Sequence, residues 1–309
     1  MNDLTPAAAL AAIAVGGLGL LWLLRRIRYK QGLESLRDKV VWITGASSGV
    51  GESCAHGFYK AGVKLILSSR RSSELERVRN DLCALKLTTP THVPRILPLD
   101  LADVKSLEKK SKEAISFHGN IDILINNGGI SFRGTAVDTT LDVDRRLMDV
   151  NYFGAVALTK GVLPCMLSNG SGHIVAVSSV QGKMAIPFRT AYTASKHALQ
   201  AFFDSLRAEL ANRDIHVTIV SPSYIKTNLS LNAVNPDGSK YGIMDSTIQN
   251  GMSTEYVANK ILQAVAHKEI DVVLGPITHK AAIYLRTLVP GIFAKVMEAR
   301  AKKGMGSEN

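Results

Sequence analysis

Seven short apolar runs recur between residues 40 and 275, separated by segments long enough for a helix. The runs lack polar alternation, which is typical of strands buried on both faces of a sheet. Two of the separating segments, 72–87 and 103–117, repeat apolar residues near the helical period. The pattern therefore predicts an α/β fold with a parallel sheet covered by helices on both faces. The expected strands are VVWIT (40–44), VKLILSS (63–69), RILPLDL (95–101), IDILINN (121–127), HIVAVSS (173–179), IHVTIVS (215–221) and DVVLG (271–275).

A glycine-containing turn follows the first expected strand. TGASSGVG, residues 44–51, places glycines where the chain must turn tightly, and the free N–H groups of the helix that follows can face a pyrophosphate. The spacing differs from the commoner G-x-G-x-x-G fingerprint, so an ordinary glycine-containing turn is the alternative. Its place after the first strand favours a dinucleotide site in a doubly wound sheet of the Rossmann type. The residues expected to bind the cofactor here are Gly45, Ser47, Ser48, Gly49, Val50 and Gly51.

The end of the second expected strand bears on the choice of cofactor. A site for NAD tends to place a carboxylate there, whereas an Arg accommodates the 2′-phosphate of NADP. Ser69 fills the strand end, and Arg70 and Arg71 follow. The sequence therefore favours NADP(H), with NAD(H) possible and an exposed basic pair as the alternative. Asp100, at the end of the third expected strand, is a candidate for the adenine edge and equally for a helix cap.

Tyr192 and Lys196 lie four residues apart in RTAYTASKHAL, so their side chains share one face of an expected helix. An ordinary amphipathic helix would explain the pair taken alone. A phenol with a pKa near 10 is poorly matched to proton transfer at neutral pH, and a neighbouring ammonium lowers that pKa. Lys196 is therefore expected to tune Tyr192 as a general acid or base.

Several motifs together resemble one enzyme family. TGASSGVG, NNGG at 126–129, Asn151 in VNYFG, Ser179, and Tyr192 with Lys196 fall in the order and spacing of short-chain dehydrogenases/reductases, over roughly residues 38–275. Three longer stretches, NNGGISFRGT, SVQGKMAIPFR and YLRTLVPG, resemble a membrane-anchored branch of that family. Two small-residue departures exist: Gly128 stands where Ala is usual, and Ser223 stands where Gly is usual.

The resemblance implies an oxidoreductase that reduces a carbonyl or oxidises a secondary alcohol. It implies that Ser179 binds the substrate oxygen together with Tyr192, and that Lys196 bonds the nicotinamide ribose. Asn151 would hold the water of a proton relay beside Lys196. Asn127 and Thr227 would contact the cofactor, Thr227 near the nicotinamide amide. The family resemblance also implies a homodimer.

The N-terminal segment differs in kind from the rest. Residues 7–24 are uncharged for 18 residues and are followed at once by RRIRYK. That order of apolar and basic residues favours an uncleaved transmembrane anchor over a cleaved signal peptide, with Trp22 near one interface. A buried helix or a re-entrant hairpin is the alternative. The basic flank predicts that the catalytic domain lies in the cytosol. The expected membrane is that of the endoplasmic reticulum, with the peroxisome as the other candidate.

Two further segments complete the expected organisation. Residues 222–252 are rich in Asn, Ser, Gly and Asp and too long for an ordinary connection, which is typical of a lid or a substrate-binding loop. Residues 277–303 are apolar but interrupted by Arg286, Pro290 and Lys295, so they predict a C-terminal helical extension. It could lie at a membrane interface, cover the substrate, pack on the core or form a dimer contact. The expected boundaries are 1–36, 37–276 and 277–309.

Composition limits the remaining functions. The net charge of +11 suits an anionic membrane surface, a phosphorylated ligand or nucleic acid, but no nucleic-acid-binding signature is present, so no nucleic-acid partner is expected. Three widely spaced cysteines and no His-Glu-x-x-His pattern indicate no metal site. The expected substrate is a lipophilic carbonyl such as a steroid or a retinoid, to which the resemblance adds acyl- or alkyl-dihydroxyacetone phosphate. The rival is a catalytically silent nucleotide-binding membrane protein that acts through a partner.

Overall fold

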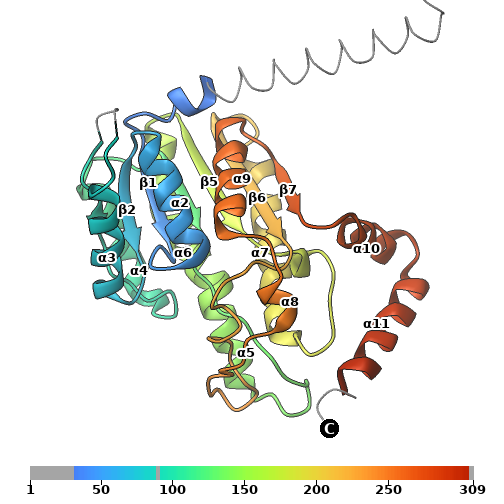
Figure 1. The fold of residues 1–309 in the computed structure, drawn as a ribbon. Helices are drawn as coiled ribbons and strands as arrows, with labels where there is room; N and C mark the ends of the chain where they lie inside the picture. Colours follow the sequence, from blue (N-terminus) through green and yellow to red (C-terminus); the bar gives the residue numbers. More distant parts are fainter. Residues whose placement is uncertain (1–30, 88–90, 306–309) are drawn as a thin grey trace, which may run out of the picture.

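A computed structural model describes residues 31–87 and 91–305 (Figure 1). One sheet of seven parallel strands runs through it in the order β3-β2-β1-β4-β5-β6-β7. The chain builds outward from β1 in one direction and from β4 in the other, so the order reverses between these two strands. The predicted doubly wound parallel sheet is confirmed. Its strands are β1 (Val40–Thr44), β2 (Lys64–Ser68), β3 (Arg95–Ile96), β4 (Ile123–Asn126), β5 (Gly172–Val177), β6 (Ile215–Pro222) and β7 (Asp271–Leu274).

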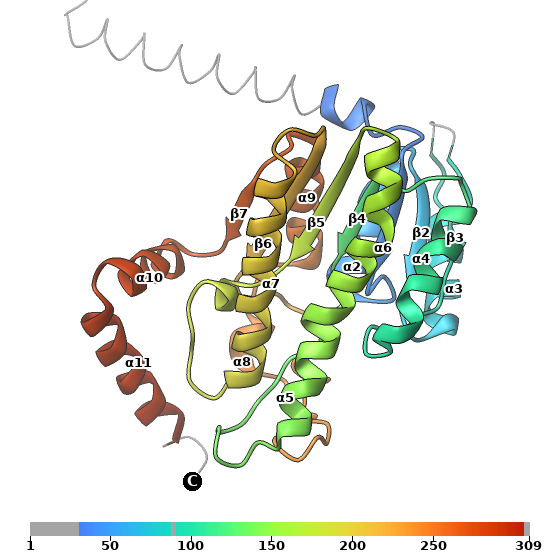
Figure 2. The ribbon, with the colours of Figure 1, turned by 180° about the vertical axis from the view of Figure 1, so that it is seen from behind.

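Helices cover both faces of the sheet. Alternate residues of β1 show why: Val41 and Ile43 pack in the core under α2, α3 and α9, whereas Val40 and Trp42 pack in the core under α4, α6 and α7. Figure 1 shows α2 and α9 in front of the sheet, and Figure 2 shows α4, α6 and α7 in front of it. The long helices are α2 (Gly49–Lys60), α3 (Ser72–Cys83), α4 (Leu107–Ser116), α5 (Leu141–Met148), α6 (Gly154–Ser168), α7 (Thr190–Glu209), α9 (Thr254–Ala266), α10 (Ile277–Leu288) and α11 (Pro290–Met305).

The third strand is shorter than its apolar run. β3 holds only two residues, although the amides of Leu97 and Leu99 still bond carbonyls of the β2 segment, at Leu67 and Ser69. Pro98 lies between the two and has no N–H to donate. An N–H at position 98 would point away from β2, so the proline does not interrupt this pairing, and the chain stays hydrogen-bonded to the β2 segment up to Leu99.

One continuous helix, residues 141–168, is long and apolar enough to be compared with a membrane span. Residues 141–168 combine α5, the π-helical turn η2 (Asp149–Phe153) and α6, and their length and apolar composition would suffice to cross a bilayer. Half of its most apolar 18-residue stretch is buried inside the protein. The helix packs on α4 and α7, so it belongs to the folded domain. The transmembrane anchor predicted at residues 7–24 lies outside the described residues.

The long segment after β6 lies against the segment after β4. The amide of Arg133 bonds the carbonyl of Val234 at 3.0 Å, and the amide of Val234 bonds the carbonyl of Ser131 at 2.9 Å. A one-turn helix, α8 (Ser246–Gln249), follows within it. These bonds hold the loop at the carboxyl ends of the strands, which is the edge where ligands bind in sheets of this type.

The C-terminal helices α10 and α11 follow β7 and lie at the side of the main body (Figures 1 and 2). Phe293 of α11 is buried against Val180 and Met184 at the turn η3 (Val180–Gly182) after β5. Most other side chains of the two helices are exposed. The predicted C-terminal extension is thus a helix pair attached to the domain through a small apolar contact.

Candidate active site

The turn between β1 and α2 is packed too tightly for any residue larger than glycine at its centre. Gly45 and Gly49 have positive φ angles of 66° and 61°. A Cβ atom on Gly51 would lie 2.2 Å from the carbonyl oxygen of Gly45. The start of α2 is thereby drawn back against the turn, and its N-terminal amides remain at the edge of the sheet where a phosphate could accept their hydrogen bonds.

Side chains of β1 and β4 brace this turn. Thr44 Oγ1 accepts hydrogen bonds from the amides of Asn127 and Gly128, each at 3.0 Å, and Asn127 Nδ2 donates to the carbonyl of Thr44 at 2.9 Å. The Asn127 amide is therefore engaged with the turn itself. Sequence reasoning did not identify the bracing role of Thr44, because it depends on a partner 83 residues away.

A cavity of about 840 Å³ runs along the carboxyl ends of the strands. The sequence-predicted residues that line it are Gly45, Ser47, Ser48, Gly49, Val50, Arg70, Asp100, Asn127, Ser179, Tyr192, Lys196 and Thr227. Two predicted site residues lie behind its wall. Gly51 is beneath the turn, and Asn151 is almost completely buried in η2. The structure thus brings predicted residues from Gly45 to Thr227, far apart in the sequence, to a single cavity.

The residues predicted to contact the cofactor beyond the glycine turn have different surroundings. Ser69 Oγ, directly after β2, is buried and has no hydrogen-bond partner among the described residues, while Arg70 and Arg71 are exposed at the rim. Asp100 accepts a hydrogen bond from the amide of Ala102 at 3.0 Å, which is the capping alternative that the sequence left open. Thr227 packs against the turn, since a Cβ atom added to Gly49 would lie 3.3 Å from Thr227 Cγ2.

Tyr192 and Lys196 lie together on α7, both almost completely buried. The Ser179 side chain lines the same cavity and acts to lower the pKa of the Tyr192 hydroxyl. The Lys196 ammonium donates to the carbonyl of Val177 at 3.0 Å and lies 5.9 Å from the centre of the Tyr192 ring. Two hydroxyls and one ammonium therefore converge at the cavity wall.

The pKa of Tyr192 in this structure differs from the one expected from the sequence. Burial raises the pKa of Tyr192, and the Ser179 side chain and the charge of Arg133 oppose that rise only in part. Burial also lowers the pKa of Lys196 to about 8. The expected lowering of the Tyr192 pKa by Lys196 is not found in this geometry, because the ammonium is directed at the Val177 carbonyl and desolvation dominates.

Asn151 is held by three hydrogen bonds. Its Oδ1 accepts from the amide of Ile130 at 2.8 Å, and its Nδ2 donates to the carbonyl of Ile130 and to Ser195 Oγ, each at 2.9 Å. The side chain therefore ties η2 to the segment after β4 and to α7. Gly129 lies beside it, since a Cβ atom there would be 3.0 Å from Asn151 Oδ1 and 3.7 Å from Lys196 Nζ.

The low pKa of Lys196 predicts a pH dependence of stability. An unfolded lysine keeps its proton up to about pH 10.4, whereas the folded one releases it near pH 8, so the unfolded state binds more protons between these values and stability rises with pH there. We expect urea unfolding of the cofactor-free protein to show a free energy higher by about 2 kcal/mol at about pH 9.5 than at about pH 7.5. Lys196→Met should remove most of that rise. Equal pH dependence in both proteins would contradict the assignment.

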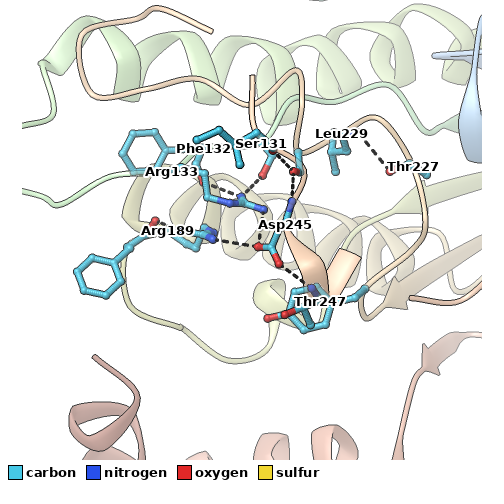
Figure 3. A network of polar contacts seen from close by, with 12 residues as sticks. Ser131, Phe132, Arg133, Arg189, Thr227, Leu229, Asp245 and Thr247 are labelled. Carbon is cyan, nitrogen blue, oxygen red and sulfur yellow. Dashed lines mark hydrogen bonds and ion pairs between the residues drawn. The ribbon is translucent and has the colours of Figure 1, made fainter. Parts of the chain in front are cut away.

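A buried charge cluster that the sequence did not reveal adjoins the cavity (Figure 3). Arg133 and Arg189 approach the same oxygen of Asp245, at 3.5 and 3.6 Å. Arg133 also donates to Ser131 Oγ at 2.8 Å, and its Nε finds no partner in the described part of the chain. Burial lowers the pKa of both arginines, that of Arg189 to about 10. Two guanidinium groups thus share one carboxylate, and the cluster carries a net positive charge.

The cavity as a whole is lined by positive charge. Among the described residues that line it, Asp100 is the one carboxylate. The lysines and arginines that line it are Arg70, Arg71, Arg133, Arg146, Lys196, Lys226, Lys240 and Arg300. Field lines from like charges around a concave site add, so this arrangement favours an anionic ligand or an anionic part of one.

Comparison with known proteins places this site in a family. The family model for short chain dehydrogenases matches residues 39–237. The chain belongs to the short-chain dehydrogenase/reductase family. It is 54% identical over 291 residues to a dehydrogenase/reductase SDR family protein 7-like of Anopheles gambiae, covering 94% of this chain and 92% of that protein. It is 47% identical over 308 residues to dehydrogenase/reductase SDR family member 7B of Bos taurus, covering 99% and 95%.

The family relationship confirms the resemblance drawn from the motifs, and it makes the chain an oxidoreductase by descent. Among solved structures, a short-chain dehydrogenase/reductase from Burkholderia phymatum in complex with NAD aligns with a TM-score of 0.73. That alignment covers 82% of this chain and 94% of the bacterial one at 22% identity, and it supports the fold alone.

Proposed function

We propose that this short-chain dehydrogenase/reductase is a membrane-anchored, NADP(H)-dependent enzyme that reduces the carbonyl of a lipophilic substrate or oxidises the matching secondary alcohol. The observation that carries the proposal is the pair of hydroxyls at the cavity wall. Ser179 and Tyr192 line the same cavity as the glycine turn, and the Ser179 side chain acts to lower the pKa of the Tyr192 hydroxyl. Ser179, Tyr192, Lys196 and Asn151 are the proposed catalytic group.

The residues of the chain fit a dinucleotide. The close packing of Gly45 and Gly51 leaves room for a pyrophosphate at the start of α2, and the unpartnered Ser69 hydroxyl at the end of β2 leaves a hydrogen bond available where a ribose or its phosphate would lie. When bound, NADPH supplies the hydride that reduces the carbonyl carbon. Gly45, Ser47, Ser48, Gly49, Val50, Arg70, Asp100, Asn127 and Thr227 are the proposed contacts.

The chain's own groups provide the proton. The Tyr192 hydroxyl, whose pKa burial keeps high, stays protonated at neutral pH and can donate to the carbonyl oxygen of the substrate. Ser179 donates a second hydrogen bond to that oxygen and helps to polarise the carbonyl. Lys196, still mainly charged at neutral pH, is the proposed partner of the nicotinamide ribose. In the oxidation direction, the phenolate accepts the proton of the alcohol.

The NADP(H) preference can be tested at Arg70. We expect Arg70→Ala to lower the ratio of NADPH to NADH affinity roughly tenfold or more, because a charged hydrogen bond to the 2′-phosphate contributes about 1.5–3 kcal/mol. Fluorescence titration with both cofactors measures the ratio. Arg145→Ala is a suitable control, since Arg145 is an exposed residue of α5 that pairs with Asp142. NADH bound as tightly as NADPH by the parent protein would contradict the preference.

The positive cavity lining supports a phosphorylated substrate among the candidates. Steroids, retinoids and acyl- or alkyl-dihydroxyacetone phosphate are all lipophilic carbonyl compounds, and only the last carries an anionic group to match the lining. NADPH consumption by the protein should be measured against this panel, with Tyr192→Phe as the control. Turnover by the parent protein alone would fix the reaction and its substrate class. NADPH binding without turnover of any member would favour the catalytically silent alternative.

The setting of the enzyme is proposed from sequence. The apolar segment 7–24 and its basic flank support a single-pass anchor in the endoplasmic reticulum, or in the peroxisomal membrane, with the catalytic domain in the cytosol. The family resemblance supports a homodimer. Full-length similarity to member 7B extends through the apolar segment, covering 99% of this chain.

A further inference from the structure

The C-terminal helices concentrate exposed apolar surface. Fifteen large hydrophobic side chains stand out as exposed among the described residues, and six of them lie within the twenty positions 277–296. These six are Ile277 (77% exposed), Tyr284 (68%), Leu288 (75%), Val289 (41%), Ile292 (54%) and Val296 (48%). Single exposed apolar residues are ordinary, but a contiguous group marks an interaction surface.

The exposed residues follow the helical period. Ile277, Ala281, Tyr284 and Leu288 are spaced by four, three and four positions, so they form one stripe along α10, and each is exposed. On α11, Ile292, Val296 and Ala299 continue with a spacing of four and three.

The opposite side of the pair provides the attachment to the domain. Ala282, Ile283 and Leu285 of α10 and Phe293 and Met297 of α11 pack toward Val180 and Met184. Each helix therefore has two apolar sides, of which the protein covers only one. We call the uncovered side, comprising Ile277, Ala281, Tyr284, Leu288, Ile292, Val296 and Ala299, the outer stripe.

The helix pair carries a strong excess of positive charge. From residue 277 to residue 303 the one acidic residue is Glu298. The basic residues in the same range are Lys280, Arg286, Lys295, Arg300, Lys302 and Lys303. Arg286 and Arg300 bond the domain, at the Lys183 carbonyl and the Tyr224 hydroxyl, whereas Lys295, Lys302 and Lys303 are exposed. An apolar stripe accompanied by exposed lysines is typical of helices that lie in the interface of an anionic membrane, and Tyr284 suits the level of the headgroups.

We propose that the outer stripe of α10 and α11 docks on a lipid bilayer with anionic headgroups, as a second membrane contact besides the proposed N-terminal anchor. A second copy of the chain fits this surface less well, because two-fold symmetry would bring its basic rim against an identical basic rim. A bilayer covers the apolar side chains and supplies the opposite charge to Lys295, Lys302 and Lys303.

The helix pair is also part of the cavity, which gives this docking a consequence. Arg300 of α11 lines the cavity and donates to the hydroxyl of Tyr224 at 2.8 Å. Met184, which lies beneath Phe293, lines it too. With the outer stripe in the membrane, this wall of the cavity stands at the bilayer surface, and a lipophilic ligand reaches the cavity without crossing water.

The test measures immersion of the stripe and needs no turnover. The full chain, with Cys83→Ser and Cys165→Ser to remove the two accessible thiols, would carry a nitroxide label at Leu288→Cys or at Ile292→Cys. It would be reconstituted in vesicles of phosphatidylcholine with phosphatidylserine. Accessibility of the label to oxygen, which concentrates in lipid, is then compared with accessibility to a water-soluble nickel complex. A label at Val137→Cys, a site that is 90% exposed and remote in sequence, is the matched control.

We expect the oxygen-to-nickel ratio at Leu288 and Ile292 to exceed the ratio at Val137 severalfold, and to fall in vesicles of phosphatidylcholine alone. Leu288→Glu should lower the ratio at the Ile292 label while leaving NADPH binding intact. Equal ratios at all three sites would overturn the proposal. Dipolar broadening at Leu288 that disappears on dilution with unlabelled chain would also overturn it, because a second copy would then cover the stripe. Insensitivity to phosphatidylserine would overturn the requirement for anionic lipid.

Discussion

Tyr192→Phe is expected to lower kcat by about a thousandfold or more, within the range by which a positioned general acid accelerates proton transfer. The substitution removes one oxygen atom from a side chain that is 7% exposed, and it leaves the ring packed against Phe132 and Val234. NADPH affinity should change little, since the pyrophosphate and adenosine contacts lie elsewhere in the cavity. Steady-state turnover on a carbonyl that the parent protein reduces, together with fluorescence titration of NADPH, measures both quantities.

Tyr256→Phe provides the matched control for this experiment. Tyr256 lies on α9 with 48% of its surface exposed and outside the cavity lining, so the same chemical change there should leave turnover unaffected. If Tyr192→Phe kept more than a tenth of the parent kcat, the proton would have to come from another group, and the proposed role of Tyr192 would be wrong.

Gly51→Ala is expected to destabilise the protein by about 3 kcal/mol and to abolish most NADPH binding. The added methyl would lie 2.2 Å from the Gly45 carbonyl oxygen and 2.6 Å from Asn127 Nδ2, so the turn and α2 must separate. Neither neighbour yields easily, because one is backbone and the other bonds the Thr44 carbonyl. Urea unfolding and cofactor titration measure the two effects.

The same helix supplies an opposite case. At Gly57 the added methyl would meet only Leu262 Cδ2, at an ordinary contact distance of 3.7 Å. Gly57→Ala should therefore stabilise the protein by a few tenths to about 1 kcal/mol, because it restricts the unfolded chain and favours the helix. A Gly51→Ala protein as stable as Gly57→Ala, with unchanged affinity for NADPH, would contradict the packing described for the turn.

The sequence was sufficient for those parts of the structure that depend on local patterns. Buried parallel strands must be apolar on both faces, so β1 and β5 stand out as continuous runs such as VVWIT and HIVAV. A turn packed as closely as the one at Gly51 accepts only glycine, so it too is visible in the sequence. β3 was predicted longer than its two residues, although single backbone bonds to the β2 segment continue at Leu97 and Leu99.

The missed features depend on partners that are distant in the chain. Arg133 and Asp245 are 112 residues apart, and Arg189 lies in a third segment. Nothing in the neighbourhood of any one of them signals a charged partner, so SFR, FRT and MDS read as ordinary loop sequence. Asn151 was identified by its motif, but its three hydrogen bonds to Ile130 and Ser195 follow from the fold and not from the motif.

The ion pairs that hold the loop after β6 in place limit how this enzyme can be redesigned. Asp245 of that loop bonds both Arg133 and Arg189, and its own amide donates to Ser230 Oγ at 2.9 Å. A loop transplanted from a relative to change substrate choice would leave two buried guanidinium groups without their carboxylate unless it brought an equivalent of Asp245 with it. The loop is therefore not an interchangeable module, and grafts should be selected on these ionic partners before they are selected on substrate fit.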